Sequence, residues 1–208
     1  MDKYIVGEAD MDKKFFVDQL KAFAVKYNIT IEEDILGEIV NKASFRIISK
    51  GEIISYIGDD TFEAGLVLSG LIRCYYIDED GNDITRGFAP EGVMCMDEGF
   101  FGYTDRICMW ETLEETTIMF CKTADIRKLI KENSNFKDIW IYLLEQALRY
   151  KIYRENGFLV ENATERYIHF NKLYPNLSKK APQKHIATYL GIAPESLSRI
   201  RKSMKEEE

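Results

Sequence analysis

The apolar positions of the chain repeat with a helical period near its N-terminus. In residues 13–28 and 30–43, apolar side chains recur every three or four positions, which predicts two amphipathic helices with a break near Asn28. Thr30 precedes Glu33 by three positions, a spacing typical of a capping box at the start of the second helix.

Between residues 44 and 121 the pattern becomes that of strands. Short runs rich in β-branched and aromatic residues alternate with Gly-, Asp- and Pro-containing turns; they are FRIIS, EIISYI, GLVLSG, LIRCYYI, ITRGFA, MWETLEE and TTIMFC. The close spacing, with no helical segment between runs, predicts an antiparallel sandwich or barrel. The sequence DEDGND between LIRCYYI and ITRGFA predicts a hairpin with a glycine-containing loop.

A helical period returns at residues 122–133 and continues over residues 135–160. The apolar surface of the 135–160 helix is broader than a small barrel can cover, which favours a second copy of the same helix as its partner. The alternative is an ordinary core helix. Residues 157–163, with the sequence GFLVENA, are predicted as the linker that follows.

Three more helices are predicted beyond the linker. Asn162 and Glu165 form a capping-box pattern before ATERYIHFNKLYP, and a polar loop, NLSKKA, leads to PQKHIATYL and then PESLSRIRKSMK. The predicted fold class is therefore α+β. Its parts are an N-terminal domain at 1–134 with an antiparallel β-barrel of the double-stranded β-helix or jelly-roll kind, a long dimerisation helix and hinge at 135–160, and an all-α domain at 161–208.

The last two helices have the residue pattern of a helix-turn-helix. Such a motif needs a small residue where the helices cross, a glycine for a positive φ angle in the turn, and apolar residues on both helices. The residues that fill these places are Ile186, Ala187, Leu190, Gly191, Ile192, Leu197 and Ile200. The alternative is a helical hairpin that only packs.

Polar residues remain on the outer face of this motif. The second helix of a helix-turn-helix enters the major groove of DNA, where an Arg pairs with guanine and a Glu accepts from cytosine. The predicted base contacts are Glu195, Ser196, Ser198 and Arg199, and the predicted phosphate contacts are Gln183, Lys184, Lys202, Lys179 and Lys180.

The charge distribution agrees with two different partners for the two ends. The net charge is −7; residues 1–162 hold 19 Lys and Arg against 30 Asp and Glu, whereas residues 163–205 hold 9 against 2. No apolar run reaches membrane-spanning length and the N-terminus lacks signal-peptide features, so we expect a cytoplasmic protein with no membrane partner. The four cysteines are expected to be reduced and buried.

A barrel of short strands, a long helix and PQKHIATYLGIAPESLSRIRK together resemble the Crp/Fnr family of bacterial transcription regulators. The resemblance covers about residues 30–205 in order of elements and is sharpest at 183–202. It implies a cyclic-nucleotide-binding-like barrel and a homodimer that binds a palindromic operator on double-stranded DNA, with RNA polymerase as a candidate further partner. It places Glu195 and Arg199 on the family's base-reading positions and Ser196 beside them on a phosphate.

The chain departs from this family pattern at the second helix. Ala193 stands where the family commonly has a Ser or Thr cap, a change of about 1 kcal/mol. Pro194 occupies the position of a basic base-reading residue in the cyclic-AMP receptor. We therefore expect fewer contacts and a different operator.

The barrel departs from the family pattern for cyclic-nucleotide binding. The resemblance implies an effector pocket at Met94, Cys95, Met96, Arg106 and Ile107, but Cys95 and Met96 replace the Gly-Glu pair and Ile107 replaces the Ser of an Arg-Ser pair. Only Arg106 matches, so the barrel is expected not to bind cyclic AMP. The effector is an unidentified small molecule or none.

Other chemistry has little support in the sequence. There is no N-terminal cysteine cluster for an iron–sulfur centre, and both histidines, His169 and His185, follow the linker, so no cofactor or metal site is predicted. A redox role for Cys95 or Cys108 stays open. The runner-up function is a ligand-sensing module whose C-terminal helices bind a protein. No catalytic set is recognisable, so an enzyme is not expected.

Overall fold

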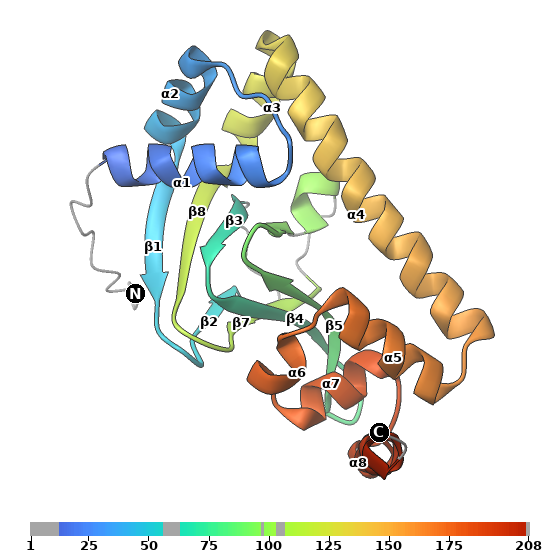
Figure 1. Ribbon diagram of the computed structural model, residues 1–208. Coiled ribbons are helices and arrows are strands. Elements are labelled where there is room, and N and C mark those ends of the chain that lie inside the picture. Colours follow the sequence, from blue (N-terminus) through green and yellow to red (C-terminus); the bar gives the residue numbers. More distant parts are fainter. Residues whose placement is uncertain (1–12, 56–62, 97, 103–106, 207–208) are drawn as a thin grey trace.

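The computed structural model describes residues 13–55, 63–96, 98–102 and 107–206 (Figure 1). The N-terminal helices and the strands are α1 Lys13–Lys26, α2 Glu33–Lys42, β1 Ser44–Ile48, β2 Ile53–Ser55, β3 Glu63–Ser69, β4 Leu71–Ile77, β5 Asp83–Pro90, β6 Met94–Met96, the 3₁₀ turn Glu98–Phe101, β7 Met109–Thr112 and β8 Thr116–Lys122. The following helices are α3 Thr123–Glu132, α4 Ser134–Val160, α5 Ala163–Leu173, α6 Leu177–Lys180, α7 Gln183–Leu190 and α8 Pro194–Glu206.

The strands form two antiparallel four-stranded sheets, which confirms the predicted antiparallel barrel. Their strand orders are β1-β8-β3-β6 and β2-β7-β4-β5. Apolar side chains fill the space between the sheets, and the buried ones are Val67, Ile72, Ala89, Cys95, Ile118 and Phe120. All four cysteines are buried and none forms a disulfide, as expected.

The hairpin predicted at DEDGND joins β4 to β5. Asp78 accepts backbone N–H groups from Asp80 and Asn82 at 3.0 and 2.7 Å, and Gly81 has a φ of +83°. A bulge between Cys74 and Tyr75 shifts the register of the pair. The bulge increases the local twist of this long hairpin, which carries the residues that contact the C-terminal helices.

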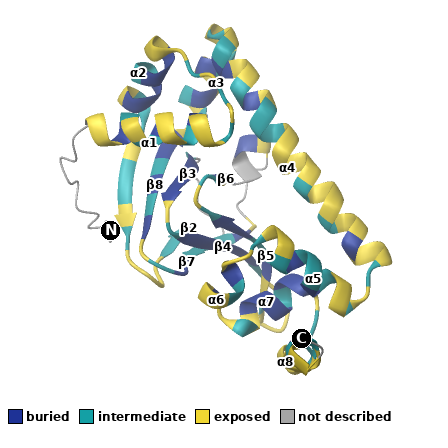
Figure 2. Cartoon of the chain, viewed as in Figure 1, coloured by how far each residue is buried: buried dark blue, intermediate teal, exposed yellow. Residues whose placement is uncertain are grey.

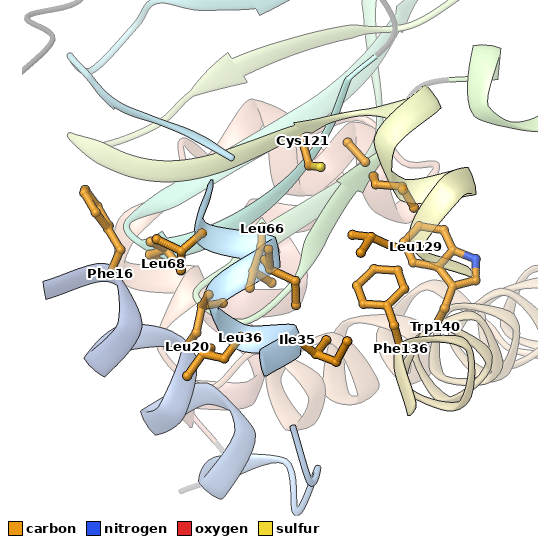
Figure 3. Packing of buried hydrophobic residues seen from close by; sticks show 14 of the residues in the cluster. Phe16, Leu20, Ile35, Leu36, Leu66, Leu68, Cys121, Leu129, Phe136 and Trp140 are labelled. Carbon is orange, nitrogen blue, oxygen red and sulfur yellow. The ribbon is translucent and has the colours of Figure 1, made fainter. Parts of the chain in front are cut away.

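The N-terminal helices pack on the barrel together with α3 and the first turns of α4. Their shared cluster includes Phe16 and Leu20 of α1, Phe136 and Trp140 of α4, and Leu129 of α3 (Figure 3). Burial of these apolar side chains is the main force that joins the helices to the sheet. Asn28, where the break between helices was predicted, adopts a positive φ of 53°.

Four local predictions differ from the structure. The second helix begins at Glu33 with Glu32 at the N-cap and no side-chain cap, so the capping box at Thr30 and Glu33 is wrong. The long helix continues through Gly157 to Val160, so the break is shorter than predicted. The loop NLSKKA contains the one-turn helix α6. Strand β6, which was not predicted, is only three residues long.

The capping box at Asn162 is confirmed. Its side chain accepts from the N–H groups of Thr164 and Glu165, and the Glu165 carboxylate accepts from the Asn162 N–H at 2.8 Å. Three backbone donors at the start of α5 are thereby satisfied. The C-terminal helices lie beside the end of the barrel that carries β4 and β5, while α4 runs along one side of the molecule from α3 to α5 (Figure 1).

Candidate nucleic-acid interface

A tight turn sets the geometry between α7 and α8. Gly191 has a φ of +68°, and its N–H and that of Ile192 donate to the Thr188 and Ala187 carbonyls at 3.1 and 3.0 Å. These two bonds form a Schellman motif, which ends a helix with a left-handed residue. A Cβ at position 191 would lie 2.8 Å from the Phe158 ring. Conformation and space therefore both require glycine here.

Apolar side chains lock the crossing of the two helices. Ile186, Ala187 and Leu197 are fully buried, and Leu190 is 2% exposed. Ile192 and Ile200 pack partly buried against the same cluster. The packing positions predicted from the sequence are thus occupied as expected.

The predicted base-contacting residues lie on the outer side of α8. Glu195, Ser198 and Arg199 are exposed and Ser196 is half-buried. Glu195 and Arg199 are separated by four positions, so their side chains share one face of the helix. Ala193 accepts from Ser196 and Leu197 as an N-cap residue does, and it brings no side-chain cap.

The predicted phosphate-contacting residues surround the same motif but differ in their partners. Lys179 is exposed, and Lys202 is within 3.9 Å of Glu206 on its own helix. Gln183 donates to the Pro194 carbonyl at 3.2 Å, across the turn. Lys180 and Lys184, by contrast, contact acids of the barrel.

The inner face of the motif packs on the barrel. Phe88 of β5 contacts the rings of Phe170, Tyr174 and Tyr189, with centroids 5.4 to 6.3 Å apart. Leu71 of β4 belongs to the same buried cluster. As Figure 2 shows, α7 and β5 present buried residues where they meet, whereas α8 is largely exposed. The two predicted domains therefore share a core in this structure.

A buried arginine organises the polar part of this contact. Arg73 of β4 is 2% exposed, and it pairs with Glu111 at 2.7 Å and Asp83 at 3.1 Å. Its Nη1 also donates to Nδ1 of His185 at 2.6 Å and to Thr85 at 3.3 Å. A buried charge needs such paired and hydrogen-bonded surroundings. His185 therefore joins α7 to the barrel as a neutral acceptor, with its remaining proton on Nε2.

The pKa values of the ionisable groups follow from this arrangement. Burial and the Arg73 charge lower the pKa of His185 to about 4. Burial alone would raise the pKa of Asp83, but the hydrogen bond and charge of Arg73 lower it overall, together with the charge of Lys184 and that of His185 once it is protonated at acid pH. At neutral pH the contact thus joins a neutral imidazole to an ionised carboxylate through Arg73.

The last turns of α4 also hold the motif. Arg154 donates to the Tyr189 carbonyl at 2.9 Å and stacks over the Tyr189 ring at 4.1 Å. The hydroxyl groups of Tyr150 and Tyr189 are 3.1 Å apart, and Arg166 of α5 donates to the Leu190 carbonyl at 3.0 Å. The orientation of α7 is therefore fixed by the barrel, α4 and α5 together.

Solved structures with the same arrangement of elements exist. One is a CooA mutant from Carboxydothermus hydrogenoformans, 20% identical, covering 85% of this chain and 82% of that one, with a TM-score of 0.66. FixK2 from Bradyrhizobium japonicum is 18% identical, and the match covers 79% of this chain and 85% of FixK2, with a TM-score of 0.68. The third is a protein from Eubacterium rectale described as a transcriptional regulator of the Crp/Fnr family. It is 18% identical, and the match covers 89% of this chain and 88% of that one, with a TM-score of 0.67. The chain has the fold of the Crp/Fnr regulators.

Comparison of the sequence itself gives no such match. No protein-family model matches it, and no curated protein sequence matches it. The resemblance to the Crp/Fnr family stated from the sequence is thus confirmed at the level of the fold, and the function requires its own argument.

Of the predicted effector residues, the structure describes the side chains of Met94, Cys95 and Ile107, and these three have different surroundings. Met94 packs against the cluster of the N-terminal helices, whereas Cys95 faces the barrel interior, where Gly65 leaves room for its sulfur. Ile107 is 48% exposed. Arg106 lies outside the described residues, as does the side chain of Met96. The effector pocket stays a prediction.

Sequence reasoning missed the contact centred on Arg73. The one signal was a charged residue in an apolar strand, LIRCYYI, since an arginine at a buried strand position requires carboxylate partners.

His169, the other histidine, contacts Glu161 through Nδ1 at 2.8 Å. In the part of the chain that the structure describes, no three His, Cys, Asp or Glu side chains form a metal-binding group. The described helices include none with the length and apolarity to cross a membrane.

Proposed function

We propose that the protein is a sequence-specific DNA-binding transcription regulator that acts as a homodimer on palindromic operators. The observation that carries the proposal is the face of α8, on which Glu195 and Arg199 are exposed one turn apart while Leu197 beside them is fully buried. Such a face supplies an acceptor for cytosine and a bidentate donor for guanine in the major groove.

The homodimer is supported by an exposed apolar stripe on α4. Ile141, Leu148, Ile152 and Leu159 are 47%, 60%, 58% and 76% exposed. Their spacings of seven, four and seven positions place them on one side of the helix, as in a coiled-coil seam. A second copy of α4 would cover this stripe and place two helix-turn-helix motifs together, which a palindromic operator requires.

Dimerisation can be tested with one substitution and a matched control. Leu148→Asp places a charge in the stripe, whereas Gln146→Asp places the same residue on an exposed position outside it. Sedimentation velocity should show a monomer for Leu148→Asp and a dimer for the wild type and Gln146→Asp. A dimer of unchanged strength for Leu148→Asp would contradict this role of α4.

DNA reading can be tested with selection of duplex sites in vitro followed by affinity measurements. The selected sites should contain two half-sites roughly 34 Å apart. Affinity should fall steeply with added salt, because Lys and Arg contacts release counterions from phosphates. A salt-independent interaction, or failure to select any duplex, would favour the alternative in which these helices bind a protein.

The signal that reaches the barrel is proposed to be something other than cyclic AMP. Cys95 is 6% exposed and packs inside the barrel, and a thiol there cannot accept from a ribose hydroxyl as a carboxylate does. Calorimetry with cyclic AMP should show no binding. Micromolar affinity would overturn this part of the proposal.

A further inference from the structure

Two lysines predicted to bind DNA phosphates lie against acids of the barrel. Nζ of Lys180 is 2.7 Å from Oε1 of Glu114, in the turn between β7 and β8. Nζ of Lys184 is 3.9 Å from Oδ2 of Asp83, the first residue of β5. We infer that Asp83 and Glu114 compete with DNA phosphates for these two ammonium groups, so that docking of α7 on the barrel opposes DNA binding. The inference rests on the proposed function.

Asp83 is well placed for this competition. It lies against the first turn of α7, where its Oδ1 is 3.7 Å from Nδ1 of His185. The first turn of a helix carries free N–H groups and a partial positive charge, the same features that bind a phosphate. Arg73 holds the Asp83 carboxylate in position at 3.1 Å. A fixed carboxylate therefore occupies the kind of environment that a DNA phosphate would need.

The neutral part of the interface keeps the acids and lysines together. The Thr85 N–H donates to Oγ1 of Thr188 at 3.2 Å, and the two threonine hydroxyl groups are 3.0 Å apart. Phe88 packs beside them on Tyr189. Buried contacts such as these supply most of the free energy of docking. The exposed ion pairs of Lys180 and Lys184 make docking sensitive to nearby charge, such as that of a DNA phosphate.

The ion pairs themselves are accessible to solvent. The side chains of Lys180 and Lys184 are 52% and 65% exposed, and those of Glu114 and Asp83 are 31% and 27% exposed. Each exposed pair contributes little free energy, so a phosphate can replace the carboxylate without a large penalty. A phosphate that approaches either lysine meets the negative charge of the carboxylate already beside it, so the two anions compete for the same ammonium group.

The first experiment measures the affinity of the full chain for a labelled duplex of about 30 base pairs with random sequence. Glu114→Gln should tighten binding about two- to fivefold, because it removes the competitor of Lys180. Glu115→Gln is the matched control: it removes the same charge from the neighbouring exposed residue. Asp83→Asn should tighten binding to a similar extent, with Asp80→Asn as its exposed control in the same hairpin.

The second experiment follows docking by hydrogen exchange. The Thr85 amide reports on docking directly, since its acceptor belongs to α7. Its exchange should accelerate in Asp83→Asn and Glu114→Gln without DNA, and in the wild type when the duplex is added. Neither Glu115→Gln nor Asp80→Asn should change it. Asp83→Asn removes a partner of buried Arg73 and can therefore prevent folding. Glu114 pairs with Lys180 and has no contact with Arg73 among the interactions described above, so Glu114→Gln still tests the competition in that case.

The outcomes separate this inference from the proposed function. If no variant binds duplex DNA at any salt concentration, the proposed function is overturned and the competition with it. If the wild type binds DNA but Glu114→Gln and Glu115→Gln have equal affinities, the competition alone is overturned. Unchanged exchange of the Thr85 amide in DNA-bound wild type would also overturn it.

Discussion

The two helices of the helix-turn-helix differ in how much of their surface is buried inside the molecule. His185 and Tyr189 on α7 are buried against the barrel and α4, whereas Glu195 and Arg199 on α8 face solvent. Among the described residues, the buried polar groups of α7 are thus paired inside the molecule, whereas Glu195 and Arg199 of α8 are exposed to solvent. The comparison teaches that substitutions of the buried residues of α7 should act on stability, and substitutions on the exposed face of α8 on recognition.

The largest loss of stability is expected when the side chain of Phe88, which joins the barrel to the C-terminal helices, is removed. Phe88 is 5% exposed and contacts three aromatic rings of the C-terminal helices. Phe88→Ala should lower the free energy of unfolding by about 3–5 kcal/mol, measured by denaturant titration. Ile84→Ala on the same strand, 38% exposed, should cost less than about 1 kcal/mol. Equal losses would contradict a shared core.

The next largest effect is a dependence on pH through His185. Its pKa is lowered to about 4, and Arg73, Asp83, Glu111 and Lys184 are the charged groups that face it. Because the unfolded state takes up the proton first, stability should fall as pH decreases from about 6.5 to about 4, by about 2–3 kcal/mol in total. Above pH 6.5 this contribution does not change.

The variant His185→Gln isolates this effect, because it keeps a polar side chain and removes the titration. The difference in unfolding free energy between wild type and variant should change over that pH window and stay constant above it. A constant difference throughout would show that His185 is not held neutral against Arg73.

A smaller loss is expected at the turn between the two helices. Gly191→Ala should destabilise by about 1–3 kcal/mol, because φ is +68° and a Cβ would meet the Phe158 ring. Gly37→Ala is the control: Gly37 lies within α2 with nothing within 4 Å of its Cβ position. That change should stabilise by about 0.5–1 kcal/mol. Thermal unfolding of both variants measures the contrast.

The smallest effect on stability is expected on the face of α8. Glu195→Ala and Arg199→Ala should change the free energy of unfolding by less than about 0.5 kcal/mol, because both side chains are exposed. A loss as large as that of Gly191→Ala would mean that these residues support the fold, and the comparison between the two helices would not hold.

The sequence predicted the elements that depend on local periodicity. The antiparallel runs, the long helix and the buried Ile186, Ala187 and Leu197 follow from spacing, since each period assigns one face to the core. The capping box at Asn162 was predicted correctly and the one at Thr30 was not, although both have Glu three positions later. The second helix begins two residues later than its pattern suggests, with its N-cap at Glu32 in place of Thr30.

The contact between barrel and motif could not be predicted in this way. It joins Arg73 and Asp83 of the hairpin to His185, more than a hundred positions along the chain. Periodicity indicates which face is buried and says nothing about which element covers it. The sequence therefore led us to predict Lys180 and Lys184 as phosphate contacts, while their carboxylate partners in the barrel became visible only in the fold.

The most direct test of the account compares wild type, Arg199→Ala and Lys202→Ala on a selected operator and on a scrambled duplex of equal length. The account predicts that Arg199→Ala loses about 1–3 kcal/mol of discrimination between the two duplexes, whereas Lys202→Ala weakens binding to both about equally. Equal weakening on both duplexes by Arg199→Ala would contradict the claim that the exposed face of α8 reads DNA sequence.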